Sequence, residues 1–436
     1  MARAAKRHHV IIGASAAGLS ALEAIRSVDG ECEITVLSKE KAPLYSRVGL
    51  THFLDGTVKV AGMSTHGVDY FERLKAKLLA GVAAVHVDPR AQRVTLSNGK
   101  ALRYDTLLVA SGSSAVIPPI KGIRLRGVYP CITRADAVAI NRALARARQV
   151  VVVGAGLIGI QAADAMAKRK KRVAIVEQMP HLMPAMVDPP PARLFEQLLR
   201  DRGHAVHTGT RAVEIVGKAG RVTGVRLESG EVVPCQVCIM AVGVRPNLEF
   251  LEGTPVERRQ GLLVDAAQQT SLPSIYAAGD AAETTDMFSG QRVLVAIWPE
   301  ALNQGRVAGL NMAGVAARYE GSMAMNATSV LGLPIASLGL WQVTDTADYR
   351  IHSELHEAQR TYRKLVFTDG RLVGAVLVGQ GVNAEAGLLH NFIRTRQSLS
   401  VTPEQLAAGP VSWGRILHVN RMAGRLAPAP AARAAA

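Results

Sequence analysis

The sequence predicts an α/β fold with two nucleotide-binding units and a smaller α+β domain behind them. Two apolar strands each run into a glycine-rich turn and a helix, at residues 8–25 and 149–168. A later strand ends in the pair Gly279-Asp280, and from residue 321 short alternating strands and turns follow. The chain of 436 residues has room for two or three domains. We expect each nucleotide-binding unit to be Rossmann-like, with three ββα layers.

The composition is that of a globular protein with a strong positive charge. Hydrophobic residues make up 48% of the chain, and 51 Lys and Arg against 35 Asp and Glu give a net charge of +16. This sign fits an acidic protein partner, an anionic membrane surface or nucleic acid. Because aromatic residues are only 4% and no nucleic-acid motif is present, we expect no nucleic-acid partner. No apolar run is long enough for a membrane span.

The start of the chain imitates a signal peptide, because basic residues precede an apolar run in MARAAKRHHVIIGASAAGLSAL. Gly13 and Gly18 interrupt that run, and Glu23 and Arg26 soon follow. A nucleotide-binding turn explains this pattern better than a cleavable leader.

The four cysteines are scattered and form no disulfide framework, which favours a reducing, cytoplasmic location. Cys235-Gln-Val-Cys238 has redox or metal spacing, but no second pair completes a zinc site. It lies in a predicted strand, whereas a reactive pair is expected at a helix N-terminus. We therefore predict buried core thiols and no metal site.

The first glycine turn, Gly13-Ala14-Ser15-Ala16-Ala17-Gly18, fits G-x-G-x-x-G except that Ser15 holds the middle place. Gly13 permits the tight turn, and Gly18 lets the helix pack against the strand. The helix N-terminus then offers amides and a positive dipole end to a pyrophosphate. The next strand, EITVLSKE, offers two candidates for the residue that binds ribose, Ser38 and Glu40.

The second glycine turn has all three glycines, Gly154, Gly156 and Gly159, and Leu157 and Ile158 open its helix. Glu177 closes the following strand, where its carboxylate can accept from both ribose hydroxyls of an adenine nucleotide. The residues after it, 178–180, supply no cation for a 2′-phosphate, and the basic run 168–172 lies at the far end of the strand. NADH is therefore favoured over NADPH.

Three more segments complete the pattern. The stretch TLLVASGS carries Ser111 and Gly112 where relatives have an A-T-G strand and turn. The stretch AVGVRPNLEF matches A-x-G-x-x-P and contains Gly243. The stretch TSLPSIYAAGDAAE contains Gly279-Asp280 at the end of a predicted strand. With these motifs in order, the chain resembles the FAD- and NAD(P)-dependent pyridine nucleotide-disulfide oxidoreductase family. It is most similar to the branch that holds NADH:rubredoxin and ferredoxin reductases, NADH oxidases, CoA-disulfide reductases and the flavin part of assimilatory nitrite reductase.

The resemblance implies four parts of the chain. They are an FAD-binding domain at 1–118 and 248–320, an inserted NAD-binding domain at 119–247, an interface or dimerisation domain at 321–410, and a basic, Ala/Pro-rich tail at 411–436. The implied FAD contacts are Gly13, Ser15, Ala16, Ala17, Gly18, Ser38 or Glu40, Arg47, Ser111, Gly112, Gly279, Asp280 and Trp298. The implied NAD contacts are Gly154, Gly156, Leu157, Ile158, Gly159, Glu177 and Gly243.

In this family the segment that is PLYSRVGLTHFL here passes beside the flavin ring. Members with one redox cysteine resemble S-F-x-x-C-G-L-P, and alignment on Gly49-Leu50 puts Val48 in the cysteine's place. The C-x-x-x-x-C of dithiol members is missing too. Because valine forms no thiolate, we expect no disulfide exchange chemistry.

Ferredoxin-reductase relatives instead resemble Y-D-R-P-P-L-S-K, and their lysine pairs with a glutamate near the flavin. Alignment on Tyr45, Arg47 and Leu50 puts His52 at the lysine position and Gln161 at the glutamate position. His52 either seats the nicotinamide or tunes the reduced flavin, or it merely packs or faces solvent. Arg47 either stabilises negative charge on the flavin or its pyrophosphate, or forms a structural ion pair.

The helix that begins near Pro299 is implied to point its N-terminus at the pyrimidine edge of the flavin, where a partial positive charge favours the reduced anion. Trp298 is either a flavin contact or a core aromatic.

We expect an FAD enzyme that passes electrons from NADH to an acidic carrier such as ferredoxin or rubredoxin. One alternative is the NADH/FAD subunit of an iron–sulfur complex of the nitrite reductase or 2-oxoacid dehydrogenase type; others are an NADH oxidase and a non-catalytic flavoprotein. A homodimer or a complex subunit is expected. The tail at Arg415–Arg425 either docks an acidic partner or is solvated.

Overall fold

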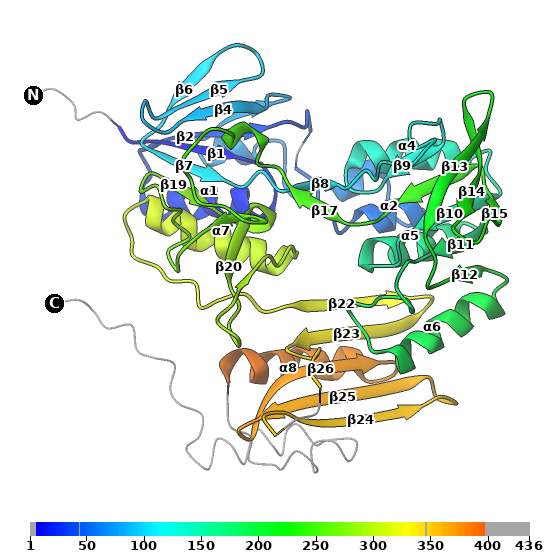
Figure 1. Ribbon diagram of the computed structural model, residues 1–436. Helices are drawn as coiled ribbons and strands as arrows, with labels where there is room; N and C mark the ends of the chain where they lie inside the picture. Colours follow the sequence, from blue (N-terminus) through cyan, green and yellow to red (C-terminus); the bar gives the residue numbers. More distant parts are fainter. Residues whose placement is uncertain (1–5, 43, 345–346, 397–436) are drawn as a thin grey trace, which may run out of the picture. The chain divides into compact units, whose positions relative to one another are not determined.

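The computed structural model describes residues 6–42, 44–344 and 347–396. These residues divide into two compact units, and each unit is described by itself (Figure 1). One unit holds the described residues up to Pro180 and those of His204–Ser322, and the other holds His181–Gly203 and those from Met323 onward. The predicted tail at 411–436 lies outside the described residues.

The first unit contains two parallel sheets, and the first of them has the strand order β19-β7-β1-β2-β3. One face of this sheet packs against helices α1 and α7, and the other packs against the antiparallel sheet β4-β5-β6. This is the predicted three-layer ββα arrangement (Figure 1). The bounds are β1 His8–Ile12, α1 Ala16–Val28, β2 Glu33–Ser38, β3 Lys77–Ala80, β4 Ala84–Asp88, β5 Arg93–Leu96, β6 Ala101–Arg103, β7 Thr106–Val109, β19 Ile275–Ala277 and α7 Trp298–Met312.

The second parallel sheet repeats the plan with the strand order β12-β11-β10-β16-β9. The antiparallel sheet β13-β14-β15 covers one face through a shared apolar core, and helices α4 and α5 pack against strands of the sheet. The bounds are β9 Val128–Pro130, α4 Arg134–Leu144, β10 Gln149–Val153, α5 Leu157–Lys168, β11 Arg172–Val176, β12 Ala205–His207, β13 Ala212–Lys218, β14 Arg221–Leu227, β15 Val232–Pro234 and β16 Val237–Met240.

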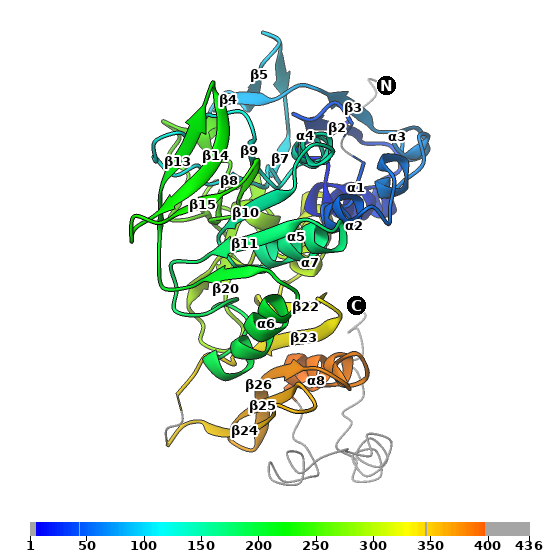
Figure 2. The ribbon, with the colours of Figure 1, turned by 90° about the vertical axis from the view of Figure 1, so that its right-hand side faces the viewer.

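Two connections join these sheets. Strands β8 (Ser113–Ala115) and β17 (Val244–Pro246) pair antiparallel where the chain leaves and re-enters the first sheet (Figure 1). Helix α2 (Leu50–Asp55) lies against α5 and α4, so the segment after β2 reaches the second sheet (Figure 2). The smaller elements of the unit are η1 Val60–Met63, α3 Tyr70–Arg73, η2 Glu249–Leu251, β18 Leu262–Leu263, η3 Gly279–Ala281, β20 Ala282–Thr285 and β21 Arg292–Val293.

The second unit is an antiparallel sheet of order β22-β23-β26-β25-β24 with helices α8 and α6. Asp188, which precedes α6, accepts hydrogen bonds at 3.0 Å from Lys364 Nζ and at 3.0 Å from the Tyr362 hydroxyl, both on β25. Residues 181–203 therefore pack with the C-terminal sheet. The four domain boundaries expected from the sequence stay a prediction. The bounds are α6 Pro189–Asp201, β22 Met325–Val330, β23 Leu333–Gly339, β24 Arg350–His356, β25 Thr361–Thr368, β26 Arg371–Val378 and α8 Val382–Thr395.

Helices α1 and α7 touch backbone to backbone because α7 carries glycines at the contact. A Cβ atom on Gly305 would lie 2.1 Å from the carbonyl oxygen of Ala17, and one on Gly309 would lie 2.5 Å from that of Ala21. Since these obstacles are backbone atoms, no side-chain rotation relieves them.

We therefore predict that Gly305→Ala loosens α1 and lowers the stability of the first unit by about 2 kcal/mol or more, the cost of overpacking a tight contact. Gly30→Ala is the matched control, because a Cβ there meets nothing within 4 Å and its φ is not positive. Thermal unfolding and the flavin content of the purified protein measure both effects. A Gly305→Ala protein as stable as Gly30→Ala would contradict the prediction.

Candidate functional site

The first glycine turn has the backbone that the sequence motif predicts. Gly13 has φ +119°, and a Cβ on it would lie 1.9 Å from the Ala110 carbonyl oxygen. A Cβ on Gly18 would lie 1.9 Å from the Gly13 carbonyl oxygen, so only glycine lets α1 approach β1 so closely. Ser15 is the N-cap of α1, and its side chain makes no capping hydrogen bond. The first-turn amides of α1, at residues 16–18, have no acceptor within the helix and fit a pyrophosphate.

The second turn repeats these contacts. Gly154 has φ +96°, a Cβ on it would lie 2.3 Å from the Ala241 carbonyl oxygen, and one on Gly159 would lie 1.9 Å from that of Gly154. Around Gly156, by contrast, a Cβ would meet nothing within 4 Å. The middle glycine therefore leaves open space for a ligand beside the start of α5, the helix that Leu157 and Ile158 open.

Glu177 lies at the carboxyl end of β11, and its buried carboxylate is fixed by two backbone amides. Oε2 accepts from the Ala155 amide at 2.6 Å, and Oε1 accepts from the Met179 amide at 2.8 Å. Each carboxylate oxygen retains acceptor capacity. The side chain is therefore positioned beside the glycine turn, where it fits the two hydroxyls of a ribose.

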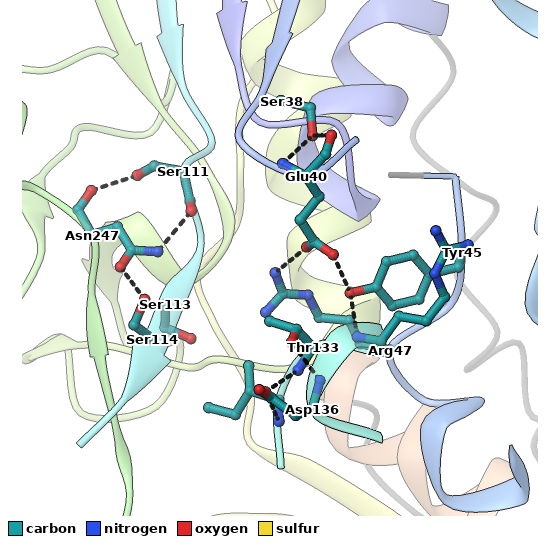
Figure 3. Close-up of polar contacts among 12 residues, drawn as sticks. Ser38, Glu40, Tyr45, Arg47, Ser111, Ser113, Ser114, Thr133, Asp136 and Asn247 are labelled. Atoms are coloured by element: carbon teal, nitrogen blue, oxygen red, sulfur yellow. Dashed lines mark hydrogen bonds and ion pairs between the residues drawn. The ribbon is translucent and has the colours of Figure 1, made fainter. Parts of the chain in front are cut away.

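The corresponding residues of the first sheet are arranged differently (Figure 3). Ser38 Oγ donates to the Glu40 carbonyl at 3.0 Å and accepts from the Glu40 amide at 3.2 Å, which closes the turn after β2. The Glu40 carboxylate accepts from the Tyr45 hydroxyl at 2.8 Å and from Arg47 Nη2 at 3.3 Å. Of the two alternatives for Arg47, this contact is the ion pair; its role toward a cofactor stays a prediction.

Tyr45 was not predicted as a site residue, although it belongs to the motif that resembles the ferredoxin reductases. Its side chain is buried, and burial raises the pKa of its hydroxyl to about 12, so the proton needed for the bond to Glu40 is retained. The same oxygen accepts from the Arg134 amide at 3.1 Å, and the Arg134 guanidinium lies 5.3 Å from the ring centroid. Tyr45 thus ties the loop after β2 to the start of α4.

A second cluster gathers around Ser111, Ser113, Ser114 and Asn247 at the carboxyl end of β7 (Figure 3), and it reaches Asp280 after β19. Ser111 Oγ donates to the Asn247 carbonyl at 2.7 Å, and Asn247 Nδ2 donates back to the Ser111 carbonyl at 3.0 Å. Ser113 Oγ donates to Asp280 Oδ2 at 2.5 Å. The segments of 111–114 and of Gly279-Asp280, distant in sequence, are therefore brought together as the motifs predict.

The glycines of this cluster have the backbone that a close ligand needs. Gly112 and Gly243 have φ +66° and +115°, and a Cβ on either would meet nothing within 4 Å. Gly279, with φ +70°, donates its amide to Gln304 at 2.8 Å, which orients the turn that carries Asp280. Asn247 and Gln304 were not predicted as site residues, because a lone amide in a turn or helix carries no motif.

Helix α2 holds the segment 44–55 against α5, the helix that carries Gln161. The His52 side chain is 61% exposed, and its Nδ1 lies 3.9 Å from the Asp55 carboxylate. Lys168 Nζ lies 3.6 Å from Asp55 and 3.0 Å from Asp164, which joins the two helices. Positions 52 and 161 therefore lie on contacting helices, and a direct His52–Gln161 pairing stays a prediction.

Trp298 is the first residue of α7, so Pro299 occupies the second position rather than the predicted first. Trp298 is half-buried and packs against the core beneath α1, as one of its two interpretations requires. Its contact with a flavin stays a prediction.

The four cysteines are buried thiols with raised pKa values. All four are buried, and burial raises the pKa of the Cys131 and Cys235 thiols to about 12. Burial also raises the pKa of the Cys32 and Cys238 thiols. Val48 is 59% exposed and has no thiol to offer, and its alignment with the family's redox cysteine stays a prediction. In the described part of the chain, no group of three His, Cys, Asp or Glu side chains is placed to hold a metal ion, and no helix has the length and apolarity needed to cross a bilayer.

Two family models match the chain. The model for pyridine nucleotide-disulphide oxidoreductases matches residues 7–305, and that for the rubredoxin NAD+ reductase C-terminal domain matches residues 325–387.

Individual relatives agree with the family models. Subunit epsilon of the NADH-dependent phenylglyoxylate dehydrogenase of Aromatoleum evansii is 33% identical over 93% of this chain and 96% of its own. The NADH oxidase of Methanocaldococcus jannaschii is 31% identical over 85% and 87%. A crystal structure of a ferredoxin reductase from Rhodopseudomonas palustris superposes with a TM-score of 0.83 at 26% identity and covers 92% of this chain and 97% of that one.

Because every thiol is buried with a raised pKa, we predict that the folded protein resists alkylation. N-ethylmaleimide at pH 7 should label close to none of the four cysteines and leave NADH oxidation unchanged. After unfolding in guanidinium all four should react, which controls for the reagent. Rapid labelling of the folded protein with loss of activity would reveal a working thiol and contradict this prediction.

Proposed function

This chain belongs to the pyridine nucleotide-disulphide oxidoreductase family, and we propose that it uses FAD to pass electrons from NADH to an acidic electron-carrier protein of the ferredoxin or rubredoxin type. The single observation that carries the proposal is the presence of two dinucleotide-binding turns together with the burial of every cysteine. Two dinucleotides can be held, and no thiol is available to pass electrons on.

FAD is assigned to the first sheet and NADH to the second. FAD supplies the chemistry that accepts a hydride from NADH and releases the electrons singly. The α1 amides bind the pyrophosphate, and Asp280, oriented by Ser113, accepts from the ribitol hydroxyls. At the second sheet, Gly156 leaves room for the NADH pyrophosphate and Glu177 accepts from the ribose. A carboxylate in that position repels a 2′-phosphate, which disfavours NADPH.

The segment 44–55 forms the wall between these sites. The Tyr45–Glu40 bond and the Asp55–Lys168 contact fix its two ends on the first and second sheets. This holds α2 against α5 and presents His52 and Val48 on the exposed side of the segment. Arg47, partly exposed beside Glu40, supplies a positive charge for the cofactor.

The net positive charge of the chain favours an acidic protein as the electron acceptor. A net charge of +16 accelerates association with an acidic protein, because complementary fields steer the encounter. The enzyme is assigned to the cytoplasm and to a homodimer or a larger assembly, in agreement with its reduced thiols and its C-terminal domain.

A second candidate function is the NADH- and FAD-binding subunit of an iron–sulfur complex that oxidises a 2-oxo acid. The relative from Aromatoleum evansii favours it, because that relative is a dehydrogenase subunit and is covered almost end to end. The clusters would then belong to partner subunits, since the family motifs in this chain include no cluster-binding cysteines. Co-purification of partner subunits from the native host separates this role from that of a free reductase.

The proposal predicts that anaerobic NADH bleaches the flavin absorbance and that NADPH does so more slowly. Addition of an acidic ferredoxin or rubredoxin should then restore the oxidised flavin spectrum while the carrier is reduced. Stopped-flow absorbance measures both steps, and cytochrome c or ferricyanide serves as a small acceptor control. Rapid turnover of CoA-disulfide without carrier reduction would contradict the assignment of Val48 and of the acceptor.

His52 provides a test of the wall itself. If His52 seats the nicotinamide, His52→Ala slows flavin reduction by NADH about tenfold or more, the cost of misplacing a reacting group. His86→Ala is the matched control, since His86 is an exposed histidine on β4. Equal rates in the wild type and in both variants would leave His52 as a solvent-facing side chain.

A further inference from the structure

The basic run at 168–172 takes no part in the site described above, although it is the most concentrated charge in the sequence. In the fold it joins a second group of cations at the end of α4. Together they form what we name the basic surface: Arg142, Arg146, Arg148, Lys168, Arg169, Lys170, Lys171 and Arg172.

The fold brings these two groups together at the amino edge of the second sheet. Gln149 of β10 is in register with Arg172 of β11, and the Arg172 amide donates to the Arg148 carbonyl at 2.9 Å. Lys171 Nζ donates to the Ala147 carbonyl at 2.9 Å. The C-terminal ends of α4 and α5 are thereby fastened side by side.

The amino edge of a parallel sheet is not where a dinucleotide binds. In parallel sheets the ligand lies at the carboxyl ends of the strands, and both the glycine turn and Glu177 are there. Arg172 begins the strand after which Glu177 follows, so about 17 Å of extended chain separates them. The basic surface is therefore not part of the NADH site.

Three of the eight cations have internal contacts. Lys168 pairs with Asp55 and Asp164, Lys171 caps a carbonyl, and the Arg169 guanidinium lies against Gly56. The other five are exposed, and among the described residues none of them has a carboxylate partner: Arg142, Arg146, Arg148, Lys170 and Arg172. Arg142 lies in the last turn of α4, and Arg146 follows two residues after the end of that helix. Like charges that crowd one surface in this way repel each other. The cluster lowers the stability of its own fold unless an anion covers it.

The basic surface adjoins α2. Lys168 and Arg169 contact Asp55 and Gly56 at the end of that helix. Val48 and Val60, on either side of α2, are 59% and 41% exposed, and they provide apolar contact beside the charges. Exposed charges together with exposed apolar side chains suit a transient protein interface.

We propose that the basic surface, with the exposed valines beside α2, docks the acidic electron carrier, an inference that rests on the proposed function. Docking there places the carrier next to the wall segment that carries His52. A protein partner is favoured over nucleic acid, because no aromatic side chain lies among the eight cations to stack on a base. An anionic bilayer is disfavoured because the surface lacks the large apolar side chains that anchor interfacial helices.

The test compares two triple variants of the full-length holoenzyme. The first, Arg146→Gln with Lys170→Gln and Arg172→Gln, removes three charges from the basic surface. The control, Arg103→Gln with Lys218→Gln and Arg221→Gln, removes three exposed charges from β6, β13 and β14. The total charge of the two variants is equal, so only the location differs.

The probe is an acidic [2Fe–2S] ferredoxin, and its binding is measured at ionic strengths of 20 and 200 mM. We expect the first variant to bind it about tenfold more weakly at the lower ionic strength and to show a reduced salt dependence. The control should change less than about twofold. The rate with NADH and ferricyanide should be the same for all three proteins.

The outcomes separate the docking surface from the proposed function. Equal weakening in both variants, no weakening in either, or no binding by the wild type at 20 mM would each overturn the docking surface. Binding that depends on the basic surface without ferredoxin reduction would support the surface and contradict the proposed function. Reduction that is unaffected by the first variant would leave the function standing and remove the surface. Binding of vesicles rich in phosphatidylserine in place of ferredoxin would reassign the surface to a membrane.

Discussion

The contact of a glycine Cα with the carbonyl oxygen of a glycine five residues earlier is the constraint on which this structure depends. It is made twice, by Gly18 over Gly13 and by Gly159 over Gly154, and each time a Cβ would lie 1.9 Å from the oxygen. The close approach sets the distance between the first helix and the first strand of each sheet. The helix amides then face the carboxyl edge, where the acidic residues gather. On the first sheet the same demand for small residues extends to α7, whose Gly305 touches the α1 backbone.

Between the two sheets, the segment after β2 depends on polar contacts at both ends. At one end Glu40 accepts from Tyr45 and Arg47, and at the other Asp55 approaches Lys168. The Asp55 side chain is 5% exposed, which makes its pairing more consequential than that of a surface carboxylate. A segment with neither helical nor strand periodicity is in this way held in one conformation. Val48, which the predicted alignment puts in the place of a redox cysteine, faces outward and takes no part in these contacts.

The sequence predicted the parts of the fold that local spacing encodes. Both glycine turns, the three-layer arrangement, the return to Gly279-Asp280 and the burial of Cys235 and Cys238 were all readable from short motifs. The contacts that join distant segments could not be predicted from the sequence. Asn247 bridges Ser111 and Ser114, and Tyr45 reaches Arg134 across 89 positions, because tertiary packing brings them together and no periodicity marks them. Likewise, the packing of residues 181–203 with the C-terminal sheet rests on Asp188, Tyr362 and Lys364, which are ordinary residues in sequence.

The distribution of charge over the second sheet has a functional consequence. Its carboxyl edge carries Glu177, held by two amides beside a positive helix N-terminus, and its amino edge carries the basic surface. A dinucleotide and an acidic protein are both anions, and on one shared cationic surface they would compete. On the proposed assignment the dinucleotide meets mainly backbone amides and one carboxylate, which attract a pyrophosphate and a ribose but not an acidic protein. The long cationic side chains lie at the opposite edge, so on the proposed assignments NADH and carrier would not compete for one surface. A reductase arranged in this way need not release its oxidised nucleotide before its carrier docks.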